Sequence, residues 1–112
     1  MNTQNRKVAF ANSLISDSLE RLNTGSFEER KLYELINIAM DNMLQDPFRY
    51  TKIQREKWPR EYVVKYNITN LWKYNLPNGW RLIYTIRGSE VEIISVILEW
   101  FSHKEYERKF GY

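Results

Sequence analysis

The chain of 112 residues contains no cysteine and a single histidine, His103. Without cysteine it cannot form a disulfide framework or a thiolate metal or redox site, and one histidine excludes a histidine-rich metal site within one chain. We therefore expect no cofactor. The sequence also lacks an apolar run near the ~18 residues that span a bilayer, and the segment from Met1 to Lys7 has no apolar stretch of the signal-peptide kind. We expect a soluble, cytoplasmic protein with no membrane partner.

Positive charge is concentrated in the middle of the chain. Residues 47–87 carry 9 basic and 2 acidic side chains, whereas residues 1–46 carry 5 and 7 and residues 88–112 carry 3 and 5. This distribution favours an anionic partner, although a basic segment can also be an ordinary solvated face. Seven aromatic residues are interleaved with the central cations: Phe48, Tyr50, Trp58, Tyr62, Tyr66, Trp72 and Tyr74. Since aromatic rings stack on bases while Lys and Arg hold phosphates, the pattern favours a nucleic acid.

Two amphipathic helices are predicted in the N-terminal half of the chain. The first covers residues 11–23, where apolar side chains recur at helical spacing, and it follows a short strand over residues 6–10. The second covers residues 26–46 and begins with Ser26 and Glu29, a capping box in which each side chain satisfies a free backbone N–H. The apolar faces of both helices predict core packing.

The rest of the chain is predicted to be a loop followed by β-structure. Residues 48–61 have no regular period and are interpreted as a long basic loop, of the kind that is often functional. Residues 62–64 form either a short strand or the anchor of this loop, and residues 103–110 form a short C-terminal helix. Three strands joined by short turns of the hairpin kind lie between them, over residues 71–76, 80–86 and 91–98.

The order β-α-α-β-β-β predicts one α+β domain over residues 1–112. Its two N-terminal helices are expected to pack on one face of a mainly antiparallel four-stranded sheet. The last three strands should be adjacent in sequence order, because their turns are too short for crossover connections.

The segment from Asn78 to Ile86, which reads NGWRLIYTI, resembles the strand G-[YW]-R-[LI]-[IV]-Y-x-[IV] of the RelE/ParE superfamily of toxins. As in those proteins, it follows a strand and a turn and precedes an apolar strand and a short polar stretch, here Ser102 to Tyr106. The order of elements is similar over nearly all of the chain. The resemblance implies a RelE-like fold and the toxin of a type II toxin–antitoxin system, held by a cognate antitoxin protein.

The ribonuclease branch of this superfamily cleaves mRNA on the ribosome and arrests growth, without metal and with the RNA's own 2′-OH as nucleophile. The resemblance implies that Arg81 contacts the scissile phosphate, that Tyr106 is the C-terminal tyrosine of this branch, and that Lys73 is one of its basic residues. Many members carry an arginine or lysine just past the last strand. This chain has Glu-Trp-Phe there, at residues 99–101, and His103 is expected to take over the role of the missing basic residue. A gyrase inhibitor and an inactive binding module of the same fold are the alternatives.

The chemistry of 2′-OH attack leads to the same catalytic candidates. The reaction requires a base, an acid and positive charge at the pentavalent phosphorane. Arg81 offers a rigid fork of donors, His103 titrates closest to neutrality, and Tyr106 shares a helical face with His103. Alternatively, Arg81 could pair with Glu92 or Glu99, and His103 could be a plain surface residue. The candidate RNA-binding residues are Lys52, Arg55, Lys57, Lys73 and Lys104.

Overall fold

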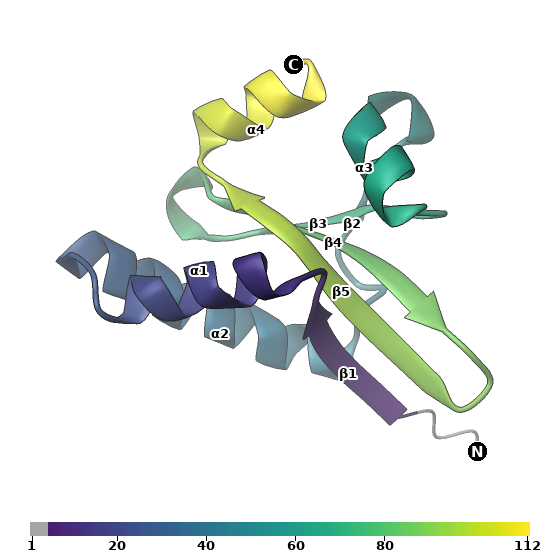
Figure 1. Ribbon diagram of the computed structural model, residues 1–112, viewed down its shortest axis with the longest axis horizontal. Coiled ribbons are helices and arrows are strands. Elements are labelled where there is room, and N and C mark those ends of the chain that lie inside the picture. The colour runs from purple at the N-terminus through teal and green to yellow at the C-terminus, as the bar shows by residue number, and fades with distance from the viewer. Residues whose placement is uncertain (1–4) are drawn as a thin grey trace.

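Five strands form one mixed sheet in the computed structural model, which describes residues 5–112 (Figure 1). Their order across the sheet is β1-β5-β4-β3-β2. β1 runs parallel to β5, and every other neighbouring pair is antiparallel. The bounds of the strands are β1 (Asn5–Phe10), β2 (Thr51–Lys52), β3 (Trp72–Asn75), β4 (Arg81–Gly88) and β5 (Glu92–Phe101).

The α+β class and the adjacency of the last three strands are confirmed, but the predicted number of four strands is wrong. The additional strand, β2, arises inside the predicted basic loop, where Thr51 pairs with Lys73 and Lys52 pairs with Trp72. A strand of two residues is too short to show the alternation of polar and apolar side chains by which strands are recognised in a sequence. Only its pairing with β3 defines β2.

Within residues 5–112, four α-helices and two 3₁₀ turns complete the fold. The helices are α1 (Ser13–Asn23), α2 (Phe27–Gln45), α3 (Arg60–Tyr66) and α4 (His103–Phe110), and the turns are η1 (Arg55–Lys57) and η2 (Pro77–Gly79). The capping box of Ser26 and Glu29 is confirmed at the start of α2. A second one, formed by Ser102 and Glu105, starts α4. None of the helices within residues 5–112 combines the length and apolarity that crossing a bilayer requires.

The predicted loop over residues 48–61 and the strand or anchor at residues 62–64 are corrected by the structure. The segment contains β2 and η1, and it leads into α3. Tyr62 is 1% exposed, whereas Val63 and Val64 are 43% and 73% exposed. The run Tyr-Val-Val has β propensity, but only Tyr62 faces the core, as expected for one face of a helix that packs on the protein.

The sheet separates two apolar cores. On one face, the α1–α2 pair covers β4 and β5, as predicted for the N-terminal helices; the buried residues there include Leu19, Ile36, Met43, Leu82, Tyr84 and Ile97. On the other face lie α3 and α4, and the buried residues include Tyr62, Leu71, Ile83, Leu98, Phe101, Tyr106 and Phe110. Figure 1 shows α1 and α2 side by side, and α3 and α4 away from them.

The last strand is longer than the sequence predicts. β5 continues through residues 99–101, and Phe101 lies opposite Arg81 in the register with β4. These three residues are therefore part of the strand and do not follow it. An irregularity in the pairing between Ile83 and Tyr84 interrupts the alternation of side chains, so the end of β5 could not be placed by counting residues of alternate polarity.

Candidate nucleic-acid interface

Cationic and aromatic side chains from four segments meet on the sheet face that carries α3 and α4. The Lys73 Nζ lies 5.0 Å and the Arg81 Cζ lies 5.8 Å from the centre of the Tyr106 ring. The ring of Tyr112 stacks against Tyr106 with centres 5.7 Å apart and an interplanar angle of 20°. The Lys57 Nζ lies 4.4 Å from the centre of the Tyr112 ring. We call these five residues the cationic–aromatic cluster.

The register of the sheet places the two cations of the cluster that lie on strands. Lys73 of β3 pairs with Ile83 of β4, and Arg81 comes two residues before Ile83. Because side chains two residues apart on a strand point to the same face, Lys73 and Arg81 are diagonal neighbours. Their face carries Ile83, which belongs to the core below α3 and α4.

Tyr106 is held over these cations by the start of α4. Arg81 lies opposite Phe101, the last residue of β5, and the capping box at Ser102 begins the helix immediately afterwards. Tyr106 then packs on Phe110 with ring centres 4.5 Å apart and planes at 26°. The short connection between β5 and α4 therefore determines which ring lies against Arg81 and Lys73.

Arg81 is half-buried and has no carboxylate partner among residues 5–112. Its Nη1 donates to the Trp80 carbonyl at 3.2 Å, while its buried Nε has no hydrogen-bond partner in the described part of the chain. Glu92 instead pairs with Lys7 at 2.8 Å, and Glu99 accepts a hydrogen bond of 2.5 Å from the Tyr62 hydroxyl. Neither carboxylate neutralises the guanidinium.

The hydroxyl of Tyr106 is a second buried donor at the same place. Tyr106 is 4% exposed, and its hydroxyl lies close to the Tyr112 phenol without making a hydrogen bond of good geometry within residues 5–112. Burial raises the pKa of Tyr106, the nearby Tyr112 phenol raises it further, and Arg81 lowers it by a smaller amount. The phenol therefore stays protonated at neutral pH and acts as a donor. Since buried donors are normally satisfied, the Arg81 Nε and the Tyr106 hydroxyl together make this a candidate place for an anion.

His103 lies on a more exposed side of α4 than Tyr106. Its side chain is 58% exposed, and its Nε2 lies 3.3 Å from the Glu107 Oε1. A Cβ placed on Gly79 would lie 3.1 Å from the His103 Cβ, so η2 packs closely against the start of α4. The structure thus brings Arg81, Tyr106, Lys73 and Lys57 together and places the His103 imidazole against Glu107.

The remaining predicted RNA-binding residues lie outside the cluster. Lys52 pairs with Trp72, and its Nζ lies 6.0 Å from the centre of that ring, on the face of the sheet opposite to Lys73. Arg55 lies over Trp58, with its Cζ 5.4 Å from the ring centre. Lys104 is exposed in the first turn of α4. The predicted RNA-binding residues therefore do not all lie on one face of the sheet.

Tyr112 was not singled out by the sequence analysis. Gly111 ends α4 with φ 76°, and the backbone N–H of Tyr112 donates to the Glu107 carbonyl at 2.9 Å. A left-handed glycine after a helix reverses the chain, so the residue that follows it returns toward the helix. The pair Gly111-Tyr112 was the signal that could have indicated this position.

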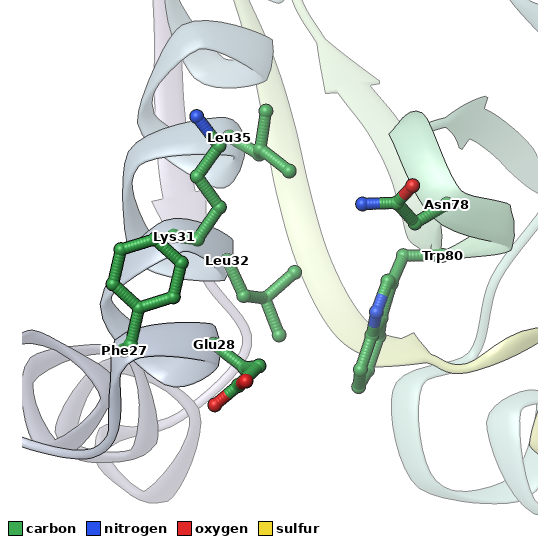
Figure 2. A pocket seen from close by; sticks show the side chains of 7 residues that line it. All are labelled: Phe27, Glu28, Lys31, Leu32, Leu35, Asn78 and Trp80. Atoms are coloured by element: carbon green, nitrogen blue, oxygen red, sulfur yellow. The ribbon is translucent and has the colours of Figure 1, made fainter.

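A separate cavity of about 420 Å³ lies between α2 and the turn before β4. Figure 2 shows Leu32 and Leu35 of α2 pointing across it toward the indole of Trp80. Trp80 packs against the core below α1 and α2, so this cavity lies on the face of the sheet opposite to the cationic–aromatic cluster. Among residues 5–112, no three His, Asp or Glu side chains gather as they would around a metal ion.

Comparisons of the chain with models of protein families, with curated proteins and with solved structures found no match. The resemblance of the β4 segment to RelE/ParE toxins therefore stays a prediction.

Proposed function

We propose that this protein is the toxin of a type II toxin–antitoxin system and that it cleaves mRNA on the ribosome through the 2′-OH of the RNA. The observation that carries the proposal is the placement of Arg81. This arginine belongs to the segment that resembles RelE/ParE toxins, and it lies beside Tyr106 with a buried, unsatisfied Nε among the described residues. A scissile phosphate that reached this pair would accept hydrogen bonds from the Arg81 Nε and from the Tyr106 hydroxyl.

In the proposed reaction, the 2′ oxygen attacks the adjacent phosphorus and the bond from phosphorus to the 5′ oxygen breaks. The products are a 2′,3′-cyclic phosphate and a free 5′-OH. Arg81 and Lys73 stabilise the charge that develops on the non-bridging oxygens, and their partial burial strengthens this effect, because less water screens them. The protonated Tyr106 hydroxyl donates a hydrogen bond to one of these oxygens or to the departing 5′ oxygen.

His103 is the proposed proton carrier. It begins α4, one turn before Tyr106, and its exposed side chain is accessible to RNA that lies along the cluster. The carboxylate of Glu107, 3.3 Å from Nε2, orients the imidazole. His103 exchanges a proton with the attacking or the departing oxygen, and solvent water exchanges the balancing proton with the other oxygen. The two transfers leave the enzyme in its original state after each cycle.

The test is cleavage of mRNA on programmed ribosomes of a compatible host. Arg81→Ala should lower the rate on the order of 10²–10³-fold, the usual cost of removing a charge-stabilising donor. His103→Ala should lower it roughly 10²–10⁴-fold. Tyr106→Phe keeps the ring and removes only the hydroxyl, so a lower rate in this variant assigns the effect to the donor.

Arg87→Ala is the matched control, because Arg87 lies at the other end of β4 and donates to the Tyr66 carbonyl. It should cleave at the wild-type rate. Full activity in both Arg81→Ala and His103→Ala would refute the assignment of the site. A wild-type protein that inhibits gyrase and leaves mRNA intact supports the gyrase alternative, and one that does neither supports a binding module.

A further inference from the structure

We infer that Lys57 and Tyr112 form a second nucleotide subsite, in which the Tyr112 ring stacks on a base and Lys57 binds a neighbouring phosphate. The subsite deepens the proposed function, on which it rests for the identity of the ligand as single-stranded RNA. It lies beside the anion site of Arg81, Lys73 and Tyr106 and is built from different segments of the chain.

The exposure of Tyr112 is the first observation that supports this subsite. The side chain is 62% exposed, although its ring stacks against the buried Tyr106. Tyr106 stacks in turn on the buried Phe110, so three near-parallel rings extend from the core to the surface. A stack that ends in an exposed ring offers its outer surface to a base, and such stacking tolerates any base because each has a π face.

The position of Lys57 is the second observation. Its Nζ lies 4.4 Å from the centre of the Tyr112 ring, and none of the ion pairs among residues 5–112 involves it. Lys57 is half-buried in η1, far in sequence from Tyr112. The ammonium lies over the ring in the free protein, so it must swing aside to a phosphate when a base takes its place on Tyr112. A lysine and an aromatic ring placed together in this way can hold a phosphate and a base of a single strand.

The third observation is the continuity between the two sites. Tyr106 contacts Tyr112 on one side, and Lys73 and Arg81 lie over the same Tyr106 ring at 5.0 and 5.8 Å. The unsatisfied Tyr106 hydroxyl and Arg81 Nε, buried among the described residues, lie at this junction. A phosphate held by Arg81 and Lys73 thus leaves an adjacent nucleotide next to Tyr112 and Lys57. The footprint on RNA is at least two nucleotides.

The experiment measures binding of the whole protein to a labelled single-stranded pentaribonucleotide by fluorescence anisotropy, without ribosomes. A set of pentaribonucleotides, each with one base removed, identifies the position at which wild-type protein needs a base. Tyr112→Leu should lower affinity for the intact pentaribonucleotide by on the order of ten-fold or more, as for other base-stacking aromatics. One of the abasic oligonucleotides lacks the base that stacks on Tyr112. Tyr112→Leu should bind this oligonucleotide with the same affinity as it binds the intact one, because a base and a ring that stack on each other act as a pair.

Two further variants separate stacking from charge. Tyr112→Phe keeps the ring and should bind as wild type does. Lys57→Gln should weaken binding of the intact and the abasic oligonucleotides alike and reduce the salt dependence. Lys31→Gln, in α2 on the opposite face of the sheet, should change neither. Circular dichroism of each variant controls for folding; the exposure of Tyr112 predicts that its replacement leaves the fold intact.

Three results would overturn the subsite. The first is wild-type protein that does not bind the pentaribonucleotide, and the second is Tyr112→Leu that binds it as well as wild type does. The third is a Tyr112→Leu substitution that lowers affinity by the same factor for every abasic oligonucleotide. Failure of the proposed function is distinguishable from these results. A protein that binds RNA with coupling at Tyr112 but does not cleave mRNA on ribosomes retains the subsite and loses the proposed activity. A protein that cleaves mRNA without this coupling retains the activity and loses the subsite.

Discussion

The guanidinium of Arg81 and the phenol of Tyr106 lie against each other, with the Arg81 Cζ 5.8 Å from the ring centre, and each keeps a buried polar atom without a hydrogen-bond partner in the described structure. Buried donors that lack partners cost about 1–3 kcal/mol each in stability. We therefore expect an anion bound at this pair to stabilise the folded protein.

Replacement of Arg81 should therefore uncouple stability from anion binding. Arg81→Met keeps an unbranched chain of similar length and removes the unsatisfied donor, so the free energy of unfolding should stay unchanged or rise by about 1 kcal/mol. Inorganic phosphate should raise the Tm of the wild-type protein by mass action and have little effect on the variant. Thermal unfolding with and without phosphate measures both effects.

Arg87→Met is the control, because Arg87 is exposed at the far end of the same strand. It should retain the phosphate response. An Arg81→Met protein that is clearly less stable than wild type, yet still responds to phosphate, would show that Arg81 supports the fold and does not bind the anion.

The salt dependence of RNA binding should distinguish the lysines by the face of the sheet on which they lie. Each phosphate contact on a single strand contributes a slope of about −0.7 to the dependence of log K on log salt concentration. Lys73→Gln should therefore reduce the slope by roughly this amount, since Lys73 lies over Tyr106. Lys52→Gln should leave it unchanged, because Lys52 lies on the opposite face. Equal effects of Lys52 and Lys73 would contradict a localised site.

Stability should fall above pH 10 because of the hydrogen bond between Tyr62 and Glu99. Burial raises the pKa of Tyr62 above its ordinary value of 10.0, and the hydrogen bond to Glu99 raises it further. The folded state therefore holds this proton more tightly than the unfolded state. The resulting stabilisation is complete below pH 10 and is lost as the pH rises beyond it, at up to about 1.4 kcal/mol per pH unit for one proton.

Tyr62→Phe should lower the free energy of unfolding at neutral pH by about 1–2 kcal/mol, the cost of one hydrogen bond to a charged group. It should also make the alkaline loss less steep, so that the difference from wild type narrows as the pH rises. In Glu99→Gln burial still raises the pKa of Tyr62, but without the carboxylate the rise is smaller, so the alkaline loss should end at a lower pH than in wild type. Urea unfolding between pH 7 and 11 measures these effects; parallel curves for wild type and Tyr62→Phe would refute the explanation.

Gly79 should be required for the close approach between η2 and α4. Its φ is +81°, and an added Cβ would lie 3.1 Å from the His103 Cβ. Gly111 has a similar φ of +76°, but an added Cβ would have no atom within 4 Å. Gly111→Ala should therefore cost only the backbone strain of roughly 1–2 kcal/mol, and Gly79→Ala should cost more. Thermal unfolding of the two variants measures the difference, and equal losses would show that the contact with His103 is unimportant.

Local patterns were sufficient for much of the architecture. The capping box at Ser26, the helical spacing in α1 and α2 and the short turns between the last strands all depend on residues close together in sequence, and each was confirmed. Arg81, Tyr106, Lys73 and Lys57 were also named from residue type, charge and resemblance. The structure brings these four together on one face of the sheet.

The division of the cations between two faces could not be predicted in this way. Lys52 and Lys73 belong to the same basic segment, yet pairing of Lys52 with Trp72 and of Lys73 with Thr51 directs them to opposite sides. A shift of one residue in register would exchange these faces, and the register depends on contacts between strands that are distant in sequence.

The sequence by itself determined α1, α2, α4 and the hairpins of the last three strands, and it determined which residue types are available for binding an anion. Only the tertiary structure decided that Tyr112 stacks on Tyr106 beside Lys57, that Glu99 binds Tyr62 in place of Arg81, and that His103 turns toward Glu107. Helix caps and tight turns are specified within a few residues by backbone hydrogen bonding. The partners of a side chain are set by the packing of whole elements, which no short segment of sequence specifies.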